Sequence, residues 1–511
     1  LGNGQKVTKN TDISRYFDYN YNDKDSVVTV FATKAFKDIL NNYNKDQQVQ
    51  FQTLIEVKRQ GYGVVKNTFI EYHNKAKQNS NTVETVTYKP ITPQASKVVT
   101  VGQETIDGLT KVVNDSGKTV IQGDTVSYTL NGQRLEENHA MVDSLTYVDD
   151  FDKDVTFSGF DVYLRDKSGK FTKADKPATY FTVKTEGSKV TWTATKALQT
   201  LLNSGKYNSD QTYTPTIVAY ATVTGEGGQV ADNTYTVTIN GKNAVSNKVT
   251  DKIAKVTPHK VVLNADGKDI NQGTVLKGQT VTYKGTWDLT DLANAKISDN
   301  AFTKEWSFSD SYDKTNGVAQ TSTLRVTDKD GKNITNLFKP VWDTKSGTWT
   351  LTATDAKKFV TTYKGQALTV TFDYTVNADV KDATKIDNTM NQVNAGKGYK
   401  SNTVTNTVES SPVVIKVVEN TDGVKIDGTS VSHNQIVTYE GTWDLTGLKG
   451  HSFTKQELNN TWSFDDDYDQ TKLTANTATL KVKDAKGNNI TDQLTATWDL
   501  KNGKWLLTPK D

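Results

Sequence analysis

The stretch LTVTFDYTV at residues 368–376 has an apolar side chain at every second position. Such alternation, with Thr and Asp between the apolar residues, is typical of a β-strand that turns one face to a core and the other to solvent. Turns rich in Gly and Asn, such as DKDGKN at 328–333, separate runs of this kind. The chain is also rich in Thr, Val and Asp. The sequence therefore predicts a mostly β fold.

This strand belongs to a long repeat. VTYKGTWDL (281–289) recurs as VTYEGTWDL (437–445), and EWSFSDSYD (305–313) recurs as TWSFDDDYD (461–469), both 156 residues later. A repeat of this length is a whole domain, because solenoid units are much shorter. More diverged copies lie upstream. We therefore predict four segments: the C-terminal half of a module at 1–92, complete modules at 93–255 and 256–411, and the N-terminal part of a further module at 412–511.

One short segment in each of the first three copies changes from strand to helix periodicity. Thr33, Thr195 and Thr354 each precede such a segment and can cap its N-terminus. The apolar stripes that follow are Phe36, Ile39 and Leu40; Leu198, Leu201 and Leu202; and Phe359 and Val360. The modules are therefore predicted to be β-sandwiches crossed by short helices.

The composition argues against several classes of function. The 511 residues have a formal net charge of +2, with Lys scattered among Asp, Thr and Asn, so no basic face for nucleic acid is predicted. No run of 18 apolar residues predicts a membrane span. The five His do not have ligand spacing, and neither G-x-S-x-G nor a phosphate-binding glycine loop occurs. We therefore predict no enzyme with turnover, and the absence of Cys fits an exported protein.

Two acidic loops resemble calcium-binding loops in part. They are NADGKD at 264–269 and FDDDYD at 464–469. The terminal Glu of an EF-hand is missing from both, and Asp-Gly pairs are common in hairpin turns. We predict no cofactor, and a structural Ca²⁺ in such loops is the alternative.

Three kinds of polar residue keep their places while the modules diverge. A lysine opens each module in a KVV context: Lys97, Lys260 and Lys416. An aspartate follows 52, 50 and 50 residues later: Asp149, Asp310 and Asp466. An asparagine in a Ser-Asn pair closes each copy whose end is present: Asn81, Asn247 and Asn402.

Lysine, aspartate and asparagine can form a covalent bond if the first and last strands of a module are neighbours. Burial would lower the pKa of the lysine and raise that of the aspartate. The neutral amine can then attack the carboxamide carbon while the protonated Asp polarises the carbonyl and relays protons to the departing ammonia. The product is an intramolecular Lys–Asn isopeptide bond. An ordinary salt bridge and hydrogen bond, repeated because the domain duplicated, is the alternative.

The assisting acid has two candidates in two of the modules. Asp288 and Asp444, in the TWDL motifs, also lie on strands near the start of a module. The module at 93–255 has Gln133 at that place, so one shared mechanism would favour Asp149, Asp310 and Asp466.

These motifs together resemble a known family. YVDDFD (147–152), TWDL (286–289 and 442–445), the KVV openings and the SNTV closings are similar to the C-terminal domains of streptococcal antigen I/II surface adhesins. They also resemble isopeptide-forming modules in adhesins of other Gram-positive bacteria, lactobacilli included. The resemblance implies DE-variant, Ig-like β-sandwiches in tandem, each with a Lys–Asn bond that an Asp assists.

The same resemblance implies a cellular role. It is that of a secreted, monomeric and elongated stalk, anchored to the bacterial cell wall, that supports cell adhesion. A host surface glycoprotein, mucus or a matrix component would be the partner.

Two other functions remain open from the sequence. One is a carbohydrate-binding or accessory region of a secreted glycan-degrading enzyme, and the other is a structural spacer without a ligand. Aromatic residues that could form a sugar platform are Trp192, Trp287, Trp306, Trp349, Trp443 and Trp462. Their repeated positions within strands favour core packing instead.

Overall fold

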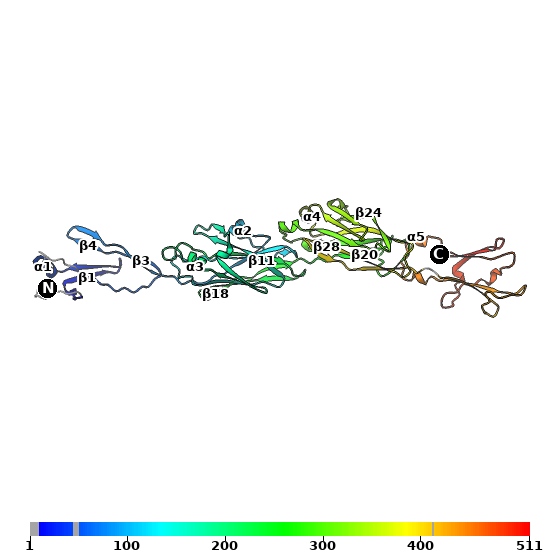
Figure 1. The fold of residues 1–511 in the computed structure, drawn as a ribbon, viewed down its shortest axis with the longest axis horizontal. Coiled ribbons are helices and arrows are strands. Elements are labelled where there is room, and N and C mark those ends of the chain that lie inside the picture. Colours follow the sequence, from blue (N-terminus) through cyan, green and yellow to red (C-terminus); the bar gives the residue numbers. More distant parts are fainter. Residues whose placement is uncertain (1–9, 44–50, 411–412, 511) are drawn as a thin grey trace. The chain divides into compact units, whose positions relative to one another are not determined.

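The computed structural model describes residues 10–43, 51–410 and 413–510 (Figure 1). Strands predominate, and the helices are few and short, which confirms the predicted mostly β fold. The chain divides into two compact units, Leu1–Tyr62 and Gly63–Asp511. No helix in the described ranges combines the length and the apolar composition that crossing a membrane requires.

In the described part of the first unit, one hairpin is followed by one helix. β1 (Phe17–Asn22) pairs with β2 (Val27–Ala32), and α1 (Lys34–Tyr43) follows. The hydroxyl of Thr33 accepts a hydrogen bond from the Phe36 amide at 3.4 Å, so Thr33 lies at the helix start as predicted. A 3₁₀ turn, Ser14–Tyr16, precedes the hairpin.

Residues 63–87 form two pairs of short antiparallel strands. β3 (Gly63–Asn67) pairs with β6 (Val83–Thr87), and β4 (Ile70–His73) pairs with β5 (Ala76–Asn79).

Residues 97–253 form the first sandwich. One five-stranded sheet has the order β13-β14-β10-β17-β18, the other has the order β12-β11-β15-β9-β7, and β16-β19-β8 form a smaller sheet. The strands are β7 (Lys97–Val101), β8 (Thr119–Val120), β9 (Thr125–Leu130), β10 (Leu145–Asp150), β11 (Val155–Arg165), β12 (Phe171–Lys173), β13 (Phe181–Glu186), β14 (Lys189–Ala194), β15 (Thr216–Val223), β16 (Val230–Asn233), β17 (Tyr235–Ile239), β18 (Lys242–Val245) and β19 (Val249–Ile253). The helices are α2 (Ile106–Lys111) and α3 (Lys196–Leu202), and Thr195 caps α3 as predicted.

Residues 259–408 form the second sandwich. Its sheets have the orders β20-β22-β27-β24 and β21-β30-β28-β23-β26-β25, with β29 beside β28. The strands are β20 (His259–Leu263), β21 (Thr274–Val275), β22 (Thr280–Asp288), β23 (Ser307–Ser311), β24 (Gly317–Thr327), β25 (Phe338–Asp343), β26 (Thr348–Ala353), β27 (Ala367–Val376), β28 (Lys385–Asn394), β29 (Lys397–Lys400) and β30 (Val404–Val408). The stretch at 368–376 lies in β27, where buried residues alternate with partly exposed ones.

One helix of the second sandwich, α4 (Ala356–Tyr363), begins one residue later than the capping prediction. Asp355 caps it by accepting from the Lys358 amide at 2.9 Å. Thr354 instead donates its hydroxyl to the Leu337 carbonyl at 2.9 Å.

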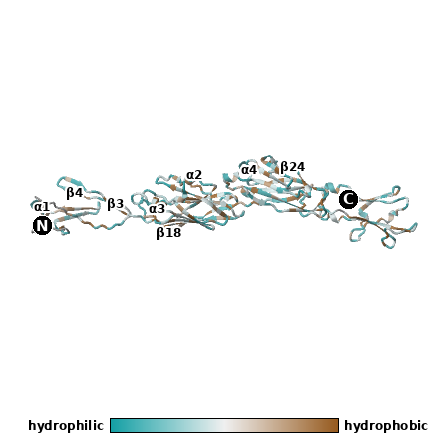
Figure 2. Ribbon diagram, in the orientation of Figure 1, coloured by the Kyte–Doolittle hydropathy of each residue, from teal (hydrophilic) through white to brown (hydrophobic). Residues whose placement is uncertain are grey.

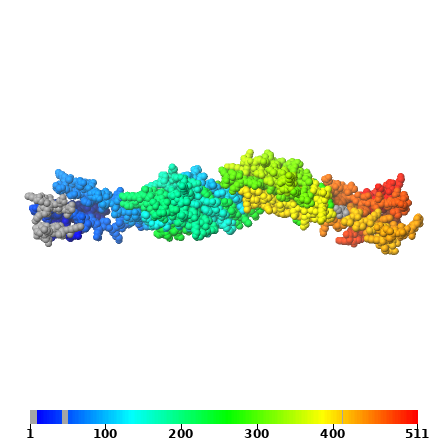
Figure 3. All heavy atoms as spheres, in the orientation of Figure 1, coloured from blue at the N-terminus to red at the C-terminus, as the bar shows by residue number. Residues whose placement is uncertain are grey.

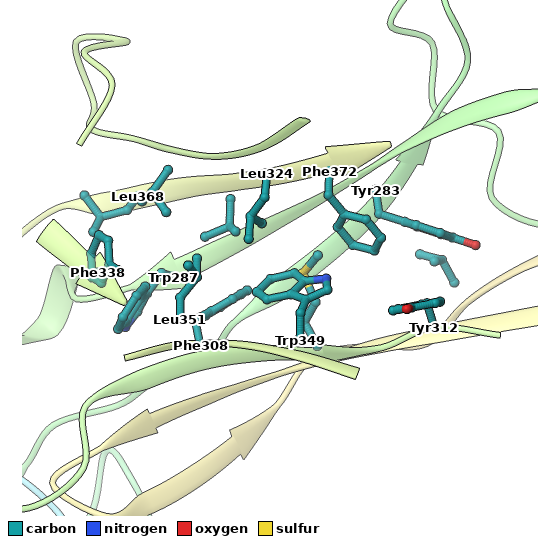
Figure 4. Packing of buried hydrophobic residues seen from close by; sticks show 14 of the residues in the cluster. Tyr283, Trp287, Phe308, Tyr312, Leu324, Phe338, Trp349, Leu351, Leu368 and Phe372 are labelled. Atoms are coloured by element: carbon teal, nitrogen blue, oxygen red, sulfur yellow. The ribbon is translucent and has the colours of Figure 1, made fainter. Parts of the chain in front are cut away.

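The cores of both sandwiches are aromatic. Trp192 lies in the first, and Trp287, Trp306 and Trp349 lie in the second, each at most 1% exposed, so these four side chains are core residues and not a sugar platform. Phe359 of α4 packs on Trp287 with ring centroids 4.9 Å apart. Figure 4 shows this second core from close by, and Figure 2 shows hydrophobic residues interspersed with hydrophilic ones along the strands.

Residues 413–510 have fewer strands. They are β31 (Val414–Glu419), β32 (Thr438–Trp443), β33 (Phe464–Asp467), β34 (Leu494–Asp499) and β35 (Lys504–Pro509). β31 pairs with β32, and β35 lies between β33 and β34. One four-residue helix, α5 (Lys455–Leu458), begins at a capping box that Thr454 and Glu457 form. Figure 3 shows this segment, in orange to red, with all heavy atoms.

Short 3₁₀ segments connect many of these elements. They are Pro177–Thr179, Thr290–Leu292, Asp299–Thr303, Thr335–Leu337, Thr446–Leu448, Thr477–Thr479 and Thr491–Gln493.

Candidate functional site

Each sandwich encloses one lysine beside one aspartate. Lys97 on β7 places Nζ 2.5 Å from Oδ2 of Asp149 on β10, and neither side chain is accessible to solvent. Lys260 on β20 donates to Asp310 on β23 in the same way, and both are again fully buried. Because β7 and β10, like β20 and β23, belong to different sheets, each pair joins the two sheets through the core. The structure thus brings together the predicted Lys and Asp in both sandwiches.

Burial shifts the protonation of these pairs. The loss of hydration lowers the pKa of Lys97 and of Lys260 to about 8, although each neighbouring carboxylate acts in the opposite direction. Burial also raises the pKa of Asp149 and Asp310. Both shifts bring the neutral amine and the protonated acid closer in free energy to the ion pair. Only the neutral amine is a nucleophile.

Aromatic rings surround the buried ammonium groups. Lys97 Nζ lies 4.9 Å from the ring centroid of Tyr128, with Phe151 and Tyr235 within 6 Å. Lys260 Nζ lies 4.5 Å from the ring of Tyr283. These rings keep water away from the lysine side chains.

The predicted asparagines contact the lysines through the main chain. Asn247 Oδ1 accepts from the Lys97 amide at 2.9 Å, and Asn247 Nδ2 donates to the Lys97 carbonyl at 2.8 Å. Asn402 forms the same two bonds with Lys260, at 2.8 and 2.9 Å. The carboxamide thus pairs with the first strand as a neighbouring peptide group would. This explains why an Asn recurs where a strand residue is expected.

The serine before each of these asparagines completes the motif. Ser246 Oγ donates to the Asn247 carbonyl at 2.8 Å and accepts from the Tyr235 amide at 3.0 Å. Ser401 makes equivalent bonds to Asn402 and Met390, and Ser80 makes them to Asn81 and Phe69. We call this arrangement the Ser-Asn clasp. In residues 63–87 both bonds of the Ser80 hydroxyl are present, and Asn81 is exposed.

A different asparagine lies beside each buried aspartate. Asn233 lies at the end of β16, and its amide acts against burial by lowering the pKa of Asp149. Asn388 on β28 has the same effect on the pKa of Asp310. These asparagines are 3% and 2% exposed. Neither carboxamide has a well-aligned hydrogen bond to any residue that the structure describes. A buried amide without such a bond costs about 1–3 kcal/mol, so its position calls for a further role.

The sequence contains a signal for these residues that the spacing argument missed. Asn233 begins Asn-Thr-Tyr and Asn388 begins Asn-Thr-Met, and Asn67 begins Asn-Thr-Phe. Each lies 14 residues before the Asn of a Ser-Asn clasp. Each also pairs with the valine two residues after that Asn: Val83, Val249 or Val404.

The alternative acids lie elsewhere. Asp288 accepts hydrogen bonds from the amides and hydroxyls of Thr257 and Thr290, at 2.6–3.1 Å. Gln133 likewise holds the start of its module, because its side-chain oxygen accepts from the Gln94 amide at 2.7 Å. Asp444 accepts from the Thr446 amide at 2.8 Å. Asp288 and Gln133 thus hold the segments that enter their modules, whereas the Asp444 bond lies within its own turn.

The third lysine pair is exposed. Lys416 Nζ lies 2.6 Å from Oδ1 of Asp466, and the two side chains are 45% and 19% exposed. The ring of Tyr439 lies 5.0 Å from this Nζ. The predicted Lys and Asp therefore meet here as well, but near solvent.

The acidic loops form turns. Asn264 Oδ1 accepts from the amides of Asp266 and Lys268 at 3.1 and 3.0 Å. Within the described ranges, no three His, Cys, Asp or Glu side chains are grouped so that they could hold a metal ion.

These features define a class of protein: a tandem array of β-sandwich domains, each with a Lys–Asp pair that links the two sheets. Residues 258–408 and 414–511 match the cell surface antigen I/II C2 terminal domain. Residues 1–88 and 94–253 match the cell surface antigen C-terminus. The chain belongs to this family of antigen I/II C-terminal domains, and its domains are of the cell-surface adhesin type.

Similar proteins include aggregation substance of Enterococcus faecalis. It is 30% identical over an alignment of 373 positions that covers 69% of this chain and 28% of that protein. The chain thus spans little more than a quarter of this relative's length. Among solved structures, the C-terminal domain of the Streptococcus agalactiae antigen I/II polypeptide BspA is 19% identical, with 61% of this chain and 99% of that chain covered and a TM-score of 0.43. The C-terminal domain of the Streptococcus pyogenes antigen I/II-family protein AspA is 16% identical, with 61% of this chain and 99% of that chain covered and a TM-score of 0.44.

Proposed function

We propose that the chain is part of an adhesin stalk at the bacterial cell surface, with one Lys–Asn isopeptide bond inside each sandwich. The observation that supports the bond most directly is the buried Lys–Asp pair with an asparagine beside it whose carboxamide lacks an aligned hydrogen bond. In place of Asn247 and Asn402, the proposed electrophiles are Asn233 and Asn388. The assisting acids are Asp149 and Asp310.

The reaction begins with a proton transfer inside the pair. Lys260 Nζ gives a proton to Asp310, which leaves a neutral amine and a protonated acid. Nζ then attacks Cγ of Asn388, and the acid donates a hydrogen bond to the carboxamide oxygen. Protons pass through Asp310 to the amide nitrogen, the C–N bond breaks, and ammonia leaves. One amide replaces another, so no oxidant or cofactor is needed.

The bond would change how the sandwich carries load. A tensile force entering at β20 would pass from Lys260 through the bond to Asn388 and on to β30. The 127 residues between them would be spared that force. The closed loop also reduces the entropy of the unfolded chain, which stabilises by about 5 kcal/mol if disulfide-like loop entropy applies. Such a domain suits a stalk.

Attachment is proposed for the whole protein. The family consists of cell-surface antigens, and the enterococcal relative is named aggregation substance. A surface glycoprotein, mucus or matrix component of the host is the proposed partner. Cell-wall anchoring and a monomeric stalk belong to the same proposal.

The test is the intact mass of the full chain and its variants. The wild type is expected to lack two ammonia molecules relative to its calculated mass, one for each sandwich. Asn388→Ala and Asp310→Ala should each restore one ammonia, whereas the matched variants Asn402→Ala and Asp288→Ala should not. A wild-type chain of full calculated mass would exclude the cross-link.

A further inference from the structure

The first sandwich contains a buried carboxyl group near its lysine site, at a position where the second sandwich has a carboxamide. Asp251 on β19 lies four residues after Asn247 and is inaccessible to solvent. The equivalent residue, four after Asn402, is Asn406 on β30, which is 2% exposed. Both belong to the strand that follows a Ser-Asn clasp, so the two sites differ by a carboxylate against a carboxamide.

Asp251 is connected to the lysine site through a tyrosine. Tyr128 on β9 donates its hydroxyl to Asp251 Oδ2 at 2.8 Å, and its ring lies 4.9 Å from Lys97 Nζ. Asp251 Oδ1 has no hydrogen-bond partner among the described residues. Asn406 is held differently, because its amide donates to the Ile270 carbonyl at 2.7 Å.

The charge of Asp251 acts on the proposed nucleophile. An ionised Asp251 favours the ammonium form of Lys97, and thus opposes the burial that favours the amine. Burial raises the pKa of Asp251 to about 6, although the hydrogen bond from Tyr128 lowers it. Its charge would therefore change between mildly acidic and neutral solution.

Other charged groups face Asp251 from the neighbouring elements. Asp115, in the turn before β8, disfavours its ionisation, and Lys97 favours it. Asp115 is itself paired with Lys296 at 2.5 Å. On β16, Asp232 forms a surface pair with Lys248 at 2.7 Å.

We propose that Asp251 slows cross-linking of the first sandwich at neutral pH and releases it in mild acid, while Asn406 leaves the second sandwich without this control. This inference rests on the proposed function. Ionised Asp251 keeps a proton on Lys97 Nζ, so fewer molecules hold the neutral amine. Protonation of Asp251 removes that constraint, and proton exchange between Lys97 and Asp149 then proceeds as it does between Lys260 and Asp310.

The experiment compares the two sandwiches within one molecule. The full chain is collected unfolded in urea, its starting mass is measured, and it is refolded by dilution at about pH 5.5 and about pH 7.5, on either side of the titration of Asp251. Samples are quenched over time and digested. Mass spectrometry then counts the Lys97–Asn233 and Lys260–Asn388 peptides separately, so the second sandwich corrects for pH effects common to both.

The rate of the first bond relative to the second should fall by about threefold to tenfold at the higher pH, which corresponds to about half a unit to one unit in the pKa of Lys97. Asp251→Asn should remove this fall by accelerating the first bond at the higher pH. Asn406→Asp should slow the formation of the second bond at the higher pH, so the rate of the first bond relative to the second should rise.

The outcomes separate the two proposals. Equal pH profiles for the two bonds in the wild type, unchanged in both variants, would overturn the role of Asp251 and leave the cross-links standing. Failure of either sandwich to lose ammonia at any pH would overturn the proposed function itself. If Asp251→Asn does not fold, Asn406→Asp still decides, because a second bond that keeps its rate at the higher pH contradicts the proposal.

Discussion

The second sandwich and residues 413–510 contain the same lysine–aspartate pair in two environments. Lys260 and Asp310 lie 50 residues apart in sequence, as do Lys416 and Asp466, and both pairs are in contact. The side chains of Lys260 and Asp310 are completely buried, whereas those of Lys416 and Asp466 are 45% and 19% exposed. In the second sandwich β27 and β28 cover the pair, and Phe372 on β27 lies 5.8 Å from Lys260 Nζ. Sequence spacing thus specifies the contact, and burial supplies the pKa shifts.

The largest expected difference is the cost of removing each lysine. Lys260→Met abolishes the proposed bond and leaves Asp310 buried without its lysine partner, so we expect the second sandwich to lose about 3–5 kcal/mol. Lys416→Met should cost less than about 1 kcal/mol, because solvent screens that pair. Hydrogen-exchange mass spectrometry of the full chain, read at β22 and at β32, measures both.

Equal losses of stability in Lys260→Met and Lys416→Met would contradict this expected difference. Lys260→Met fills much of the volume of the lysine stem, so the exchange reports the lost charge pair and bond more than a cavity.

A smaller effect is expected from the Ser-Asn clasp. Asn402→Ala removes two hydrogen bonds to the main chain of Lys260 and should destabilise the second sandwich by about 1–3 kcal/mol. The bond should still form, because Asn402 then has only a structural role. Exchange at β20 measures the loss, and the intact mass is the control. If ammonia were retained in this variant, Asn402 and not Asn388 would be the electrophile.

Much of this arrangement could be predicted from the sequence. Period-two patterns predict strands because sheet faces alternate, and β27 shows it. The repeat identified Lys97, Lys260, Asp149 and Asp310. A polar residue that persists in a strand with a buried face needs a polar partner inside the core, so their recurrence predicts that they pair.

The choice of asparagine could not be made from spacing alone. Spacing does not show which asparagine lies beside the Lys260 main chain and which lies beside the Asp310 carboxylate. Asn402 lies next to the lysine main chain, whereas Asn388, two residues before the partner of Asp310, lies beside the carboxylate. The start of α4 was missed for a similar reason, because the Thr354 hydroxyl was already engaged with Leu337.

A comparable effect is expected in the first sandwich, where it depends on the pH. The pKa of Asp251 is raised from 3.8 to about 6 on folding. A carboxyl with a raised pKa contributes stability that is complete below about pH 4 and is lost as the pH rises through about 6. The loss amounts to about 3 kcal/mol by pH 8, and Asp251→Asn should abolish it. Exchange at β9 across this range measures the difference, and a flat wild-type profile would contradict the assigned shift.

The central claim is tested most directly by digesting the folded wild-type chain and sequencing its cross-linked peptides by tandem mass spectrometry. The expected result is one branched peptide that joins Lys97 to Asn233 and another that joins Lys260 to Asn388, each lighter by one ammonia. Linear peptides containing unmodified Lys97 and Lys260, or branches that end at Asn247 and Asn402, would contradict it.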